Sequence, residues 1–325
     1  MSSMVIVNPA VPESYLPPAL ANGYKAQSHV FFLVFGAWFW DFVNAIPEEY
    51  TTVWRRRQNV VTMFYISSRL ATFCAIVTAI LVQITPTTHC NILKYFMCLS
   101  MAVASAGGSF LFVVRLFAVY DRSRVIAAIT GILWTSTLGT SIAVPFSLIF
   151  GHIGPTDFCI AERVGWFGSL VVPFSITTVF DTLVFVLITW RMGMVSQDLA
   201  AETSYVSRLL SLLRGDGLPR FSKAVLQHGQ KYFLATVVLN ILVVVMLTTP
   251  TVPNVLHSIF IIPTIAMQNA LSCRIYRETM LDIASVRSQR IDIVNQSPLQ
   301  FQRDIDLSDM MSKNGLGSLD RADSL

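Results

Sequence analysis

Long apolar blocks with almost no charged residues dominate this chain and restrict what it can fold into. Hydrophobic residues make up 54% of the sequence and charged residues 13%, whereas soluble domains carry about 25% charged residues. Blocks of ~18 or more such residues are long enough to cross a bilayer as helices. Helices satisfy their own backbone hydrogen bonds in lipid, and the alternating pattern of barrel strands is absent. The sequence therefore predicts an all-α membrane protein.

Seven blocks predict seven transmembrane helices, each long enough to cross ~30 Å of hydrocarbon at 1.5 Å per residue. They run over about His29–Ile46, Asn59–Ile84, Ile92–Tyr120, Arg124–Phe150, Phe167–Arg191, Lys231–Thr249 and Val252–Cys273. The first is the shortest and contains Asp41, and prolines predict a tight turn between the last two. We expect residues 29–273 to form one membrane domain.

The distribution of Lys and Arg predicts the orientation. With these helices, three basic residues fall on the side of the N-terminus, eighteen fall on the other side, and Arg69 and Arg115 lie within helices. Cytosolic loops carry the excess of Lys and Arg. We therefore expect residues 1–28 to be a flexible external tail. Residues 274–325 would be a cytosolic tail with an amphipathic start and a disordered end.

Four ionisable residues lie inside the predicted helices, namely Asp41, Arg69, Arg115 and Asp181. Charges at that depth are costly, so they pair or face a polar cavity. Residues at a similar distance from the inner ends of their helices can meet across the bundle. This depth predicts two pairs, Asp41 with Arg115 and Asp181 with Arg69. These pairs could lock the bundle, Arg115 could reach the inner surface without a partner, or the deeper pair could mark a ligand or ion path.

Three of the five cysteines have predicted roles. Cys90 starts the third helix and Cys159 lies in the outer loop after the fourth, so both face the oxidising side, where disulfides persist. We expect a Cys90–Cys159 bond that ties this loop to the bundle. Cys273, at the inner end of the seventh helix, is either a palmitoylation site or an unmodified structural thiol.

Other functional classes receive no support from the sequence. Nothing resembles a zinc-protease, nucleophile-elbow or phosphate-loop motif, so we expect no enzyme activity, catalytic residue, cofactor or metal site. The basic residues lack the interleaved aromatics suited to nucleic acid. The expected surroundings are a lipid bilayer.

Several segments resemble a family of basidiomycete seven-helix membrane proteins with a domain of unknown function near the N-terminus. The resemblance rests on Trp40–Tyr50, Val53–Arg57, Ser68–Leu70, Arg115–Arg124 and Cys273–Arg277. The family more often has Asn-Arg-Tyr where this chain has Ser68–Leu70. The resemblance implies a seven-helix architecture and no particular activity.

The plan is also similar to that of heptahelical receptors. Tyr120-Asp121-Arg122 stands where such receptors carry an acidic-Arg motif, although Ser123 replaces the usual aromatic and no Asn-Pro-x-x-Tyr segment follows. Our leading hypothesis is a plasma-membrane receptor that senses an external small ligand and couples to a cytosolic signalling partner through Arg122 and Arg124. The alternative hypotheses are an ion-coupled carrier that uses Asp181 and Arg69, and a membrane enzyme.

Overall fold

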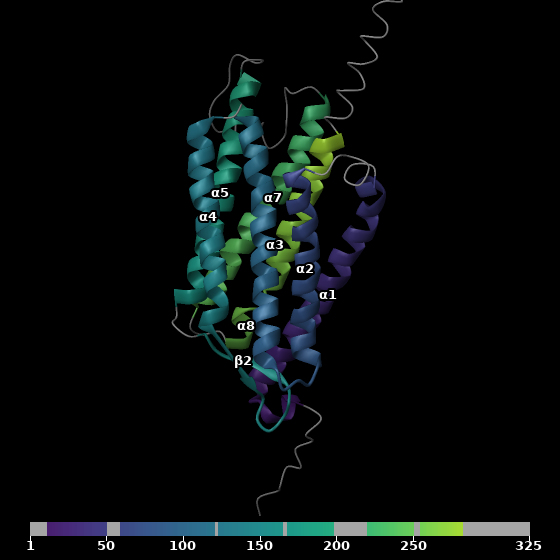
Figure 1. Cartoon of the computed structure of the whole chain (residues 1–325), viewed down its shortest axis with the longest axis vertical. Helices are drawn as coiled ribbons and strands as arrows, with labels where there is room; N and C mark the ends of the chain where they lie inside the picture. The colour runs from purple at the N-terminus through teal and green to yellow at the C-terminus, as the bar shows by residue number, and fades with distance from the viewer. Residues whose placement is uncertain are drawn as a thin grey trace, which may run out of the picture. The chain divides into compact units, whose positions relative to one another are not determined.

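A computed structural model describes residues 12–50, 59–120, 123–164, 168–197, 220–249 and 254–281 of the chain. The chain divides into two compact units, Met1–Tyr276 and Arg277–Leu325. The first unit holds the helical bundle (Figure 1). The predictions for residues 1–11, for Arg122 and for the end of the C-terminal tail beyond residue 281 lie outside the described residues.

Helices make up nearly all of the bundle, as the sequence predicts. A 3-10 helix, η1 (Pro12–Tyr15), is followed by α1 (Pro18–Glu49), α2 (Val60–Ile84), α3 (Cys90–Val119), α4 (Arg124–Ser147), α5 (Gly168–Gln197), α7 (Arg220–Thr248) and α8 (Asn254–His257). A turn at residues 258–260 leads into a last helix over residues 261–281.

In the described part of the chain, five helices are long and apolar enough to cross a membrane. They are Pro18–Glu49, Val60–Ile84, Cys90–Phe117, Arg124–Phe146 and Leu170–Arg191, while the apolar helix Leu234–Thr248 is shorter. Large apolar side chains also lie exposed on their outer faces, including Leu33 at 73%, Trp40 at 71% and Phe146 at 77%. Apolar surface on this scale indicates contact with lipid or another protein. The count of seven spans and the orientation stay predictions.

The first helix starts much earlier than predicted. We placed its start at His29, but α1 begins at Pro18, and proline is favoured in the first helical turn. Tyr24 and Gln27, which we assigned to a flexible tail, are buried. At the other end α1 continues through Pro47 to Glu49 instead of stopping at Ile46. Similarly, α7 begins at Arg220 rather than at Lys231.

A small β-hairpin replaces the predicted end of the fourth helix. Helix α4 ends at Ser147, and residues up to Phe150, which we expected to be helical, belong to strand β1 (Leu148–His152). This strand pairs antiparallel with β2 (Cys159–Val164). Gly154 supplies the positive φ of 56° in the connecting turn. The hairpin contacts α2, α3 and α4 and lies at the same end of the bundle as α8 (Figure 1).

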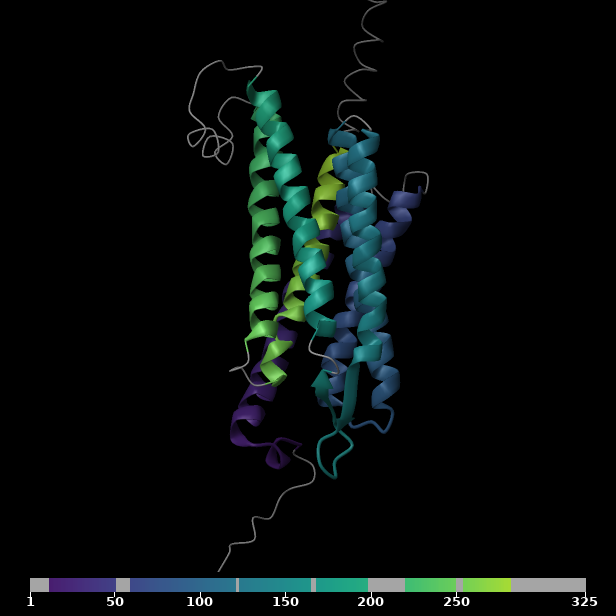
Figure 2. The ribbon, with the colours of Figure 1, turned by 90° about the vertical axis from the view of Figure 1, so that its left-hand side faces the viewer.

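Helices α2 and α3 pack unusually closely, and α5 and α7 also lie side by side (Figure 2). A Cβ atom added to Gly107 would lie only 2.5 Å from Ser68 Cβ, so the close approach of α3 to α2 requires glycine there. The buried apolar side chains form several clusters. One cluster joins α1 and α2 to the last helix, and another joins α3 to α5. The first cluster borders the cavity described next, because Phe31, Ala79 and Ile262 also line it.

Candidate functional site: a cavity beneath a disulfide-tied hairpin

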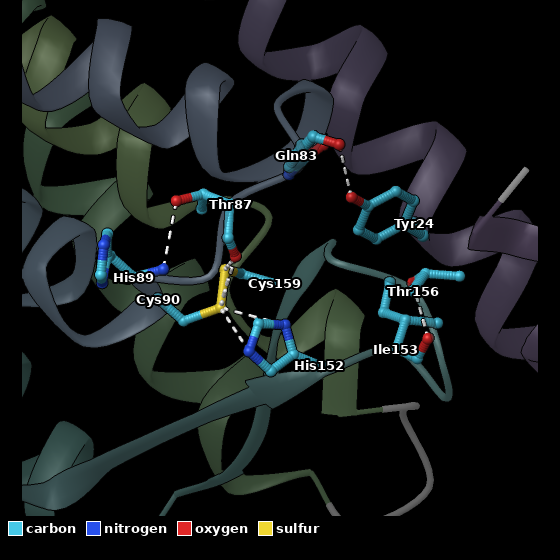
Figure 3. The surroundings of a disulfide bond; sticks show 9 residues. All are labelled: Tyr24, Gln83, Thr87, His89, Cys90, His152, Ile153, Thr156 and Cys159. Carbon is cyan, nitrogen blue, oxygen red and sulfur yellow. Dashed lines mark hydrogen bonds between the residues drawn. A yellow bond between two sulfur atoms is a disulfide. The ribbon is translucent and has the colours of Figure 1, made fainter. Parts of the chain in front are cut away.

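The predicted Cys90–Cys159 disulfide is present, with the two Cα atoms 5.7 Å apart. It joins the first residue of α3 to the first residue of β2 (Figure 3). Two further bonds hold the hairpin in place. The backbone N–H of Thr87 donates to the carbonyl of Asp157 at 2.7 Å, and Lys94 Nζ donates to the carbonyl of Leu148 at 3.0 Å. The hairpin is therefore fixed to the start of α3 and to the loop before it.

A cavity of about 170 Å³ lies between the hairpin and the helices. Side chains from α1, α2, α3, α4, α5, α7, the hairpin and residues 258–268 line it. For scale, an engineered cavity of about 150 Å³ lined by apolar side chains binds benzene. The cavity is thus large enough for a small organic molecule. It is smaller than the ~300–1,000 Å³ pockets that bind drug-sized ligands.

The lining of this cavity is mostly apolar and uncharged among the described residues. Phe31, Phe150 and Phe174 contribute rings, and Met97 and Met101 contribute flexible thioethers. Among the described lining residues there is no Asp, Glu, Lys, Arg or His. An ion would lose its hydration there without meeting an opposite charge, at a large cost in free energy.

Among the described lining residues, Gln83 has a buried side-chain acceptor without a partner. Its side-chain Oε1 is buried and has no hydrogen-bond partner among the described residues. By contrast, its backbone carbonyl accepts a bond of 2.7 Å from Tyr24 Oη (Figure 3). Gln27, another lining amide, already donates to Ser258 Oγ at 2.9 Å. A buried polar group without a partner costs free energy, so the side-chain amide of Gln83 is a candidate to hydrogen-bond a molecule in the cavity.

Asp181 lies next to the cavity and is fully buried. Its Oδ2 accepts a hydrogen bond of 2.7 Å from Asn240, a lining residue on α7. Gln268, another lining residue, lies at 3.5 Å from the same oxygen and also at 3.5 Å from Ser109 Oγ. Asp181 Oδ1 finds no partner in the described part of the chain. These residues form a polar cluster that connects α3, α5, α7 and the last helix.

The predicted charge pairs are not the ones in the structure. Arg69 on α2 contacts Asp41 on α1, with Nη2 at 3.4 Å from Oδ2, and also forms an ion pair with Glu49. Tyr65 donates a short hydrogen bond to Glu49 and accepts one of 3.2 Å from Arg69. The expected Asp181–Arg69 and Asp41–Arg115 pairings were therefore wrong. Because Arg69 is held by α1, it does not contribute to the cluster around Asp181.

The other predicted residues lie away from the cavity. Arg115 is half-buried on α3 and Arg124 is exposed at the start of α4. Near them, Tyr120 Oη donates to the carbonyl of Leu187 at 2.9 Å, and Arg191 lies over the Tyr120 ring. Burial raises the pKa of Tyr120, and the Arg191 charge offsets part of that rise. This contact joins α3 to α5 close to Arg124.

Cys273 is a free but fully buried cysteine that packs with Tyr65 and Leu111. Acylation requires an accessible thiol, so its burial favours the structural role over palmitoylation. At the other end, His152 Nδ1 lies 3.7 Å from Cys90 Sγ, and the two cysteines with this histidine have the spacing of metal ligands. Because the two sulfurs are bonded to each other, they offer no thiolate to a metal.

Sequence reasoning missed the amides that build the cluster. Asn240 interrupts an otherwise apolar stretch of α7, and Gln268 and Asn269 stand together in an apolar stretch of the last helix. A buried polar residue in such a stretch signals a hydrogen-bonded site. We restricted that argument to charged residues, which is why these three were overlooked.

The fold and site define a helical protein whose apolar helices are suited to a membrane and whose bundle contains a small, mostly apolar cavity beside a disulfide-tied hairpin. Comparison with protein-family models and with curated proteins finds no match for this chain.

Proposed function

We propose that this chain is a receptor-like plasma-membrane protein that binds a small external ligand in the cavity beneath the hairpin. The observation that carries the proposal is the cavity itself, which is lined by side chains from seven helical segments and both strands of the hairpin. A molecule in this position would contact helices that are far apart in the sequence. Its binding energy could therefore shift the helices relative to one another.

The proposal includes seven spans with the N-terminus outside. The excess of Lys and Arg on one side of the predicted helices supports this orientation. With the N-terminus outside, the disulfide would lie in an oxidising compartment, where such bonds persist. The ligand would then enter from the hairpin end. The response would leave at the opposite end, where the start of α4 carries Arg124, through which we propose that a cytosolic signalling partner is contacted. The resemblance to the basidiomycete family is consistent with this plan and stays a prediction.

A cavity-filling variant tests ligand binding. Ala102 on α3 lines the cavity, whereas Ala143 on α4 is exposed and does not. We expect a ligand found by thermal stabilisation of the purified chain to stabilise the wild type and Ala143→Phe but not Ala102→Phe. Equal stabilisation of all three would show that the ligand binds elsewhere and would remove the basis of the proposal.

Coupling across the molecule needs its own measurement. A fluorescent label on Arg124→Cys, in a variant in which Cys74, Cys98 and Cys273 are replaced, should change its emission when the ligand binds. Adding Ala102→Phe should abolish the change. An unchanged signal with a saturating ligand would mean that binding is not transmitted to this end, and the receptor proposal would fall.

A carrier is the second candidate, and one observation favours it. Asp181 is buried beside the cavity with an oxygen that has no partner in the described residues, and buried carboxylates of this kind mark ion or proton paths in membrane proteins. Solute or proton flux into proteoliposomes that Asp181→Asn abolishes would favour the carrier. Ligand-dependent fluorescence without flux would favour the receptor.

A further inference from the structure

The uncharged lining and the unused acceptor of Gln83 together restrict what the cavity can bind. We propose that its ligand is a small, neutral and mostly apolar molecule with one hydroxyl group, and that this hydroxyl forms a hydrogen bond with the side-chain amide of Gln83. This inference rests on the proposed function, because it names the ligand class of the same cavity.

The size of the ligand follows from the cavity volume. A cavity of about 170 Å³ is close to the ~150 Å³ that accepts benzene. The ligand is therefore near the size of a single aromatic ring or of a short branched chain. Three phenylalanine rings and two methionine thioethers in the lining provide apolar contacts for such a molecule.

The charge of the ligand follows from the lining. Carboxylates and amines would leave water for a surface with no charged side chain among its described residues, and an unpaired buried ion carries a large desolvation cost. The nearby ions do not change this conclusion. Asp181 is not itself a lining residue, because the lining amides Asn240 and Gln268 contact its carboxylate. Arg69 is paired with Asp41 and Glu49, and Lys94 donates to the carbonyl of Leu148.

The hydroxyl follows from the hydrogen bonds of the polar lining residues. Gln27 is bonded to Ser258, and Asn240 is bonded to Asp181. Gln83 is more than nine-tenths buried, and its Oε1 has no partner in the described bundle. A hydroxyl can both donate and accept a hydrogen bond, so it suits this amide in either orientation. Sites that hydrogen-bond a ligand hydroxyl also discriminate against analogues that lack it.

Four probes of nearly equal shape test this inference: benzyl alcohol, toluene, benzoate and benzylammonium. Binding to the purified full-length chain in phosphatidylcholine nanodiscs is measured by calorimetry, with empty nanodiscs as the correction for partitioning into lipid. We expect benzyl alcohol to bind about tenfold more tightly than toluene, as one hydrogen bond provides, and both ions to show no saturable binding. This comparison uses the wild type and does not depend on the folding of any variant.

Two variants assign the effect to Gln83. Gln83→Met keeps the length of the side chain and removes the acceptor, so the preference for benzyl alcohol over toluene should vanish. Ala143→Phe, at an exposed position outside the lining, is the control and should keep the preference. Loss of the preference in both variants would overturn the assignment to Gln83.

The outcomes separate this inference from the proposed function. Equal binding of toluene and benzyl alcohol to the wild type, or saturable binding of benzoate or benzylammonium, would overturn the ligand class while leaving the cavity as a ligand site. No saturable binding of any probe would also overturn the ligand class. If the probes bind Ala102→Phe as tightly as the wild type, their binding site lies outside the cavity. Both the ligand class and the proposed function would then be wrong.

Discussion

Gln268 and Asn269 are consecutive in the last helix, yet their side chains join two separate hydrogen-bond networks. Gln268 Nε2 faces Asp181 and Ser109 beside the cavity. Asn269 donates to Ser68 on α2 at 3.1 Å and accepts from Trp38 Nε1 on α1 at 3.3 Å. Successive residues of a helix point about 100° apart, so one short stretch contacts both halves of the bundle. A rotation of this helix would disturb both networks together.

Removing the indole donor should reveal the second network. Trp38→Phe keeps an aromatic ring in the core but leaves Asn269 Oδ1 without its bond, so we expect a loss of about 1–2 kcal/mol of unfolding free energy. In a double-mutant cycle with Asn269→Leu, the two losses should be non-additive, since both variants remove the same bond. Unfolding in mixed micelles provides the measurement. Trp190→Phe, at a 65% exposed site, should have almost no effect, and strictly additive losses would contradict the contact.

The ion pairs of Arg69 should be essential for stability. Arg69 is 5% exposed and faces two carboxylates, with Glu49 12% and Asp41 35% exposed. Arg69→Ala leaves these carboxylates without their cation, and we expect a loss of roughly 3–5 kcal/mol. Arg124→Ala, at an exposed position, is the control and should change stability very little.

The two carboxylates should contribute unequally. Glu49 is more buried than Asp41 and also accepts a hydrogen bond from Tyr65. We therefore expect Glu49→Gln to lower the melting temperature more than Asp41→Asn does. A larger effect of Asp41→Asn in the same detergent would mean that the 3.4 Å contact with Asp41 is the stronger one.

The disulfide should stabilise the bundle and position the hairpin. It closes a loop with a sequence separation of 69 residues, and disulfides of this kind contribute roughly 2–4 kcal/mol, mainly by restricting the unfolded chain. We expect Cys90→Ser and Cys159→Ser to lower the melting temperature equally, and the double variant to resemble each single one. Cys74→Ser, which replaces a free cysteine, should have little effect. Different losses in the two single variants would mean that one cysteine has a role outside the bond.

The helical class was predictable because it follows from long apolar blocks in the sequence. The disulfide was predictable because both cysteines fall on the side of the membrane expected to be oxidising. The charge pairing failed because it depended on where one helix ends. We ended the first helix at Ile46, but α1 continues through Pro47 to Glu49. Asp41 then lies eight residues before that end, or about 12 Å, and Arg69 lies nine residues after the start of α2, or about 14 Å. With the observed boundaries, depth alone would have paired Asp41 with Arg69.

The cavity and its polar cluster could not be predicted in the same way. Gln83 and Gln27 come from α2 and α1, and Gln268 comes from the last helix. That all three line one cavity depends on how three helices are rotated about their axes. The hydrophobic pattern does not define this rotation when nearly every helix face is apolar. The hairpin was missed because its strand Leu148–His152 continues the apolar character of α4, and short apolar runs do not distinguish strand from helix.

The contact between α2 and α3 gives the sharpest packing test. A Cβ atom on Gly107 would meet Ser68 Cβ at 2.5 Å and the carbonyl of Phe64 at 3.2 Å. Gly107→Ala should therefore force the helices apart and cost about 1–3 kcal/mol. Gly131 on α4 has no atom within 4 Å of its added Cβ, so Gly131→Ala should be neutral or stabilise the helix by about 0.5–1 kcal/mol. Thermal unfolding of both variants under the same conditions checks the pair. A stable Gly107→Ala variant would mean that α2 and α3 separate easily, and the wall of the cavity that they form would then be adaptable rather than rigid.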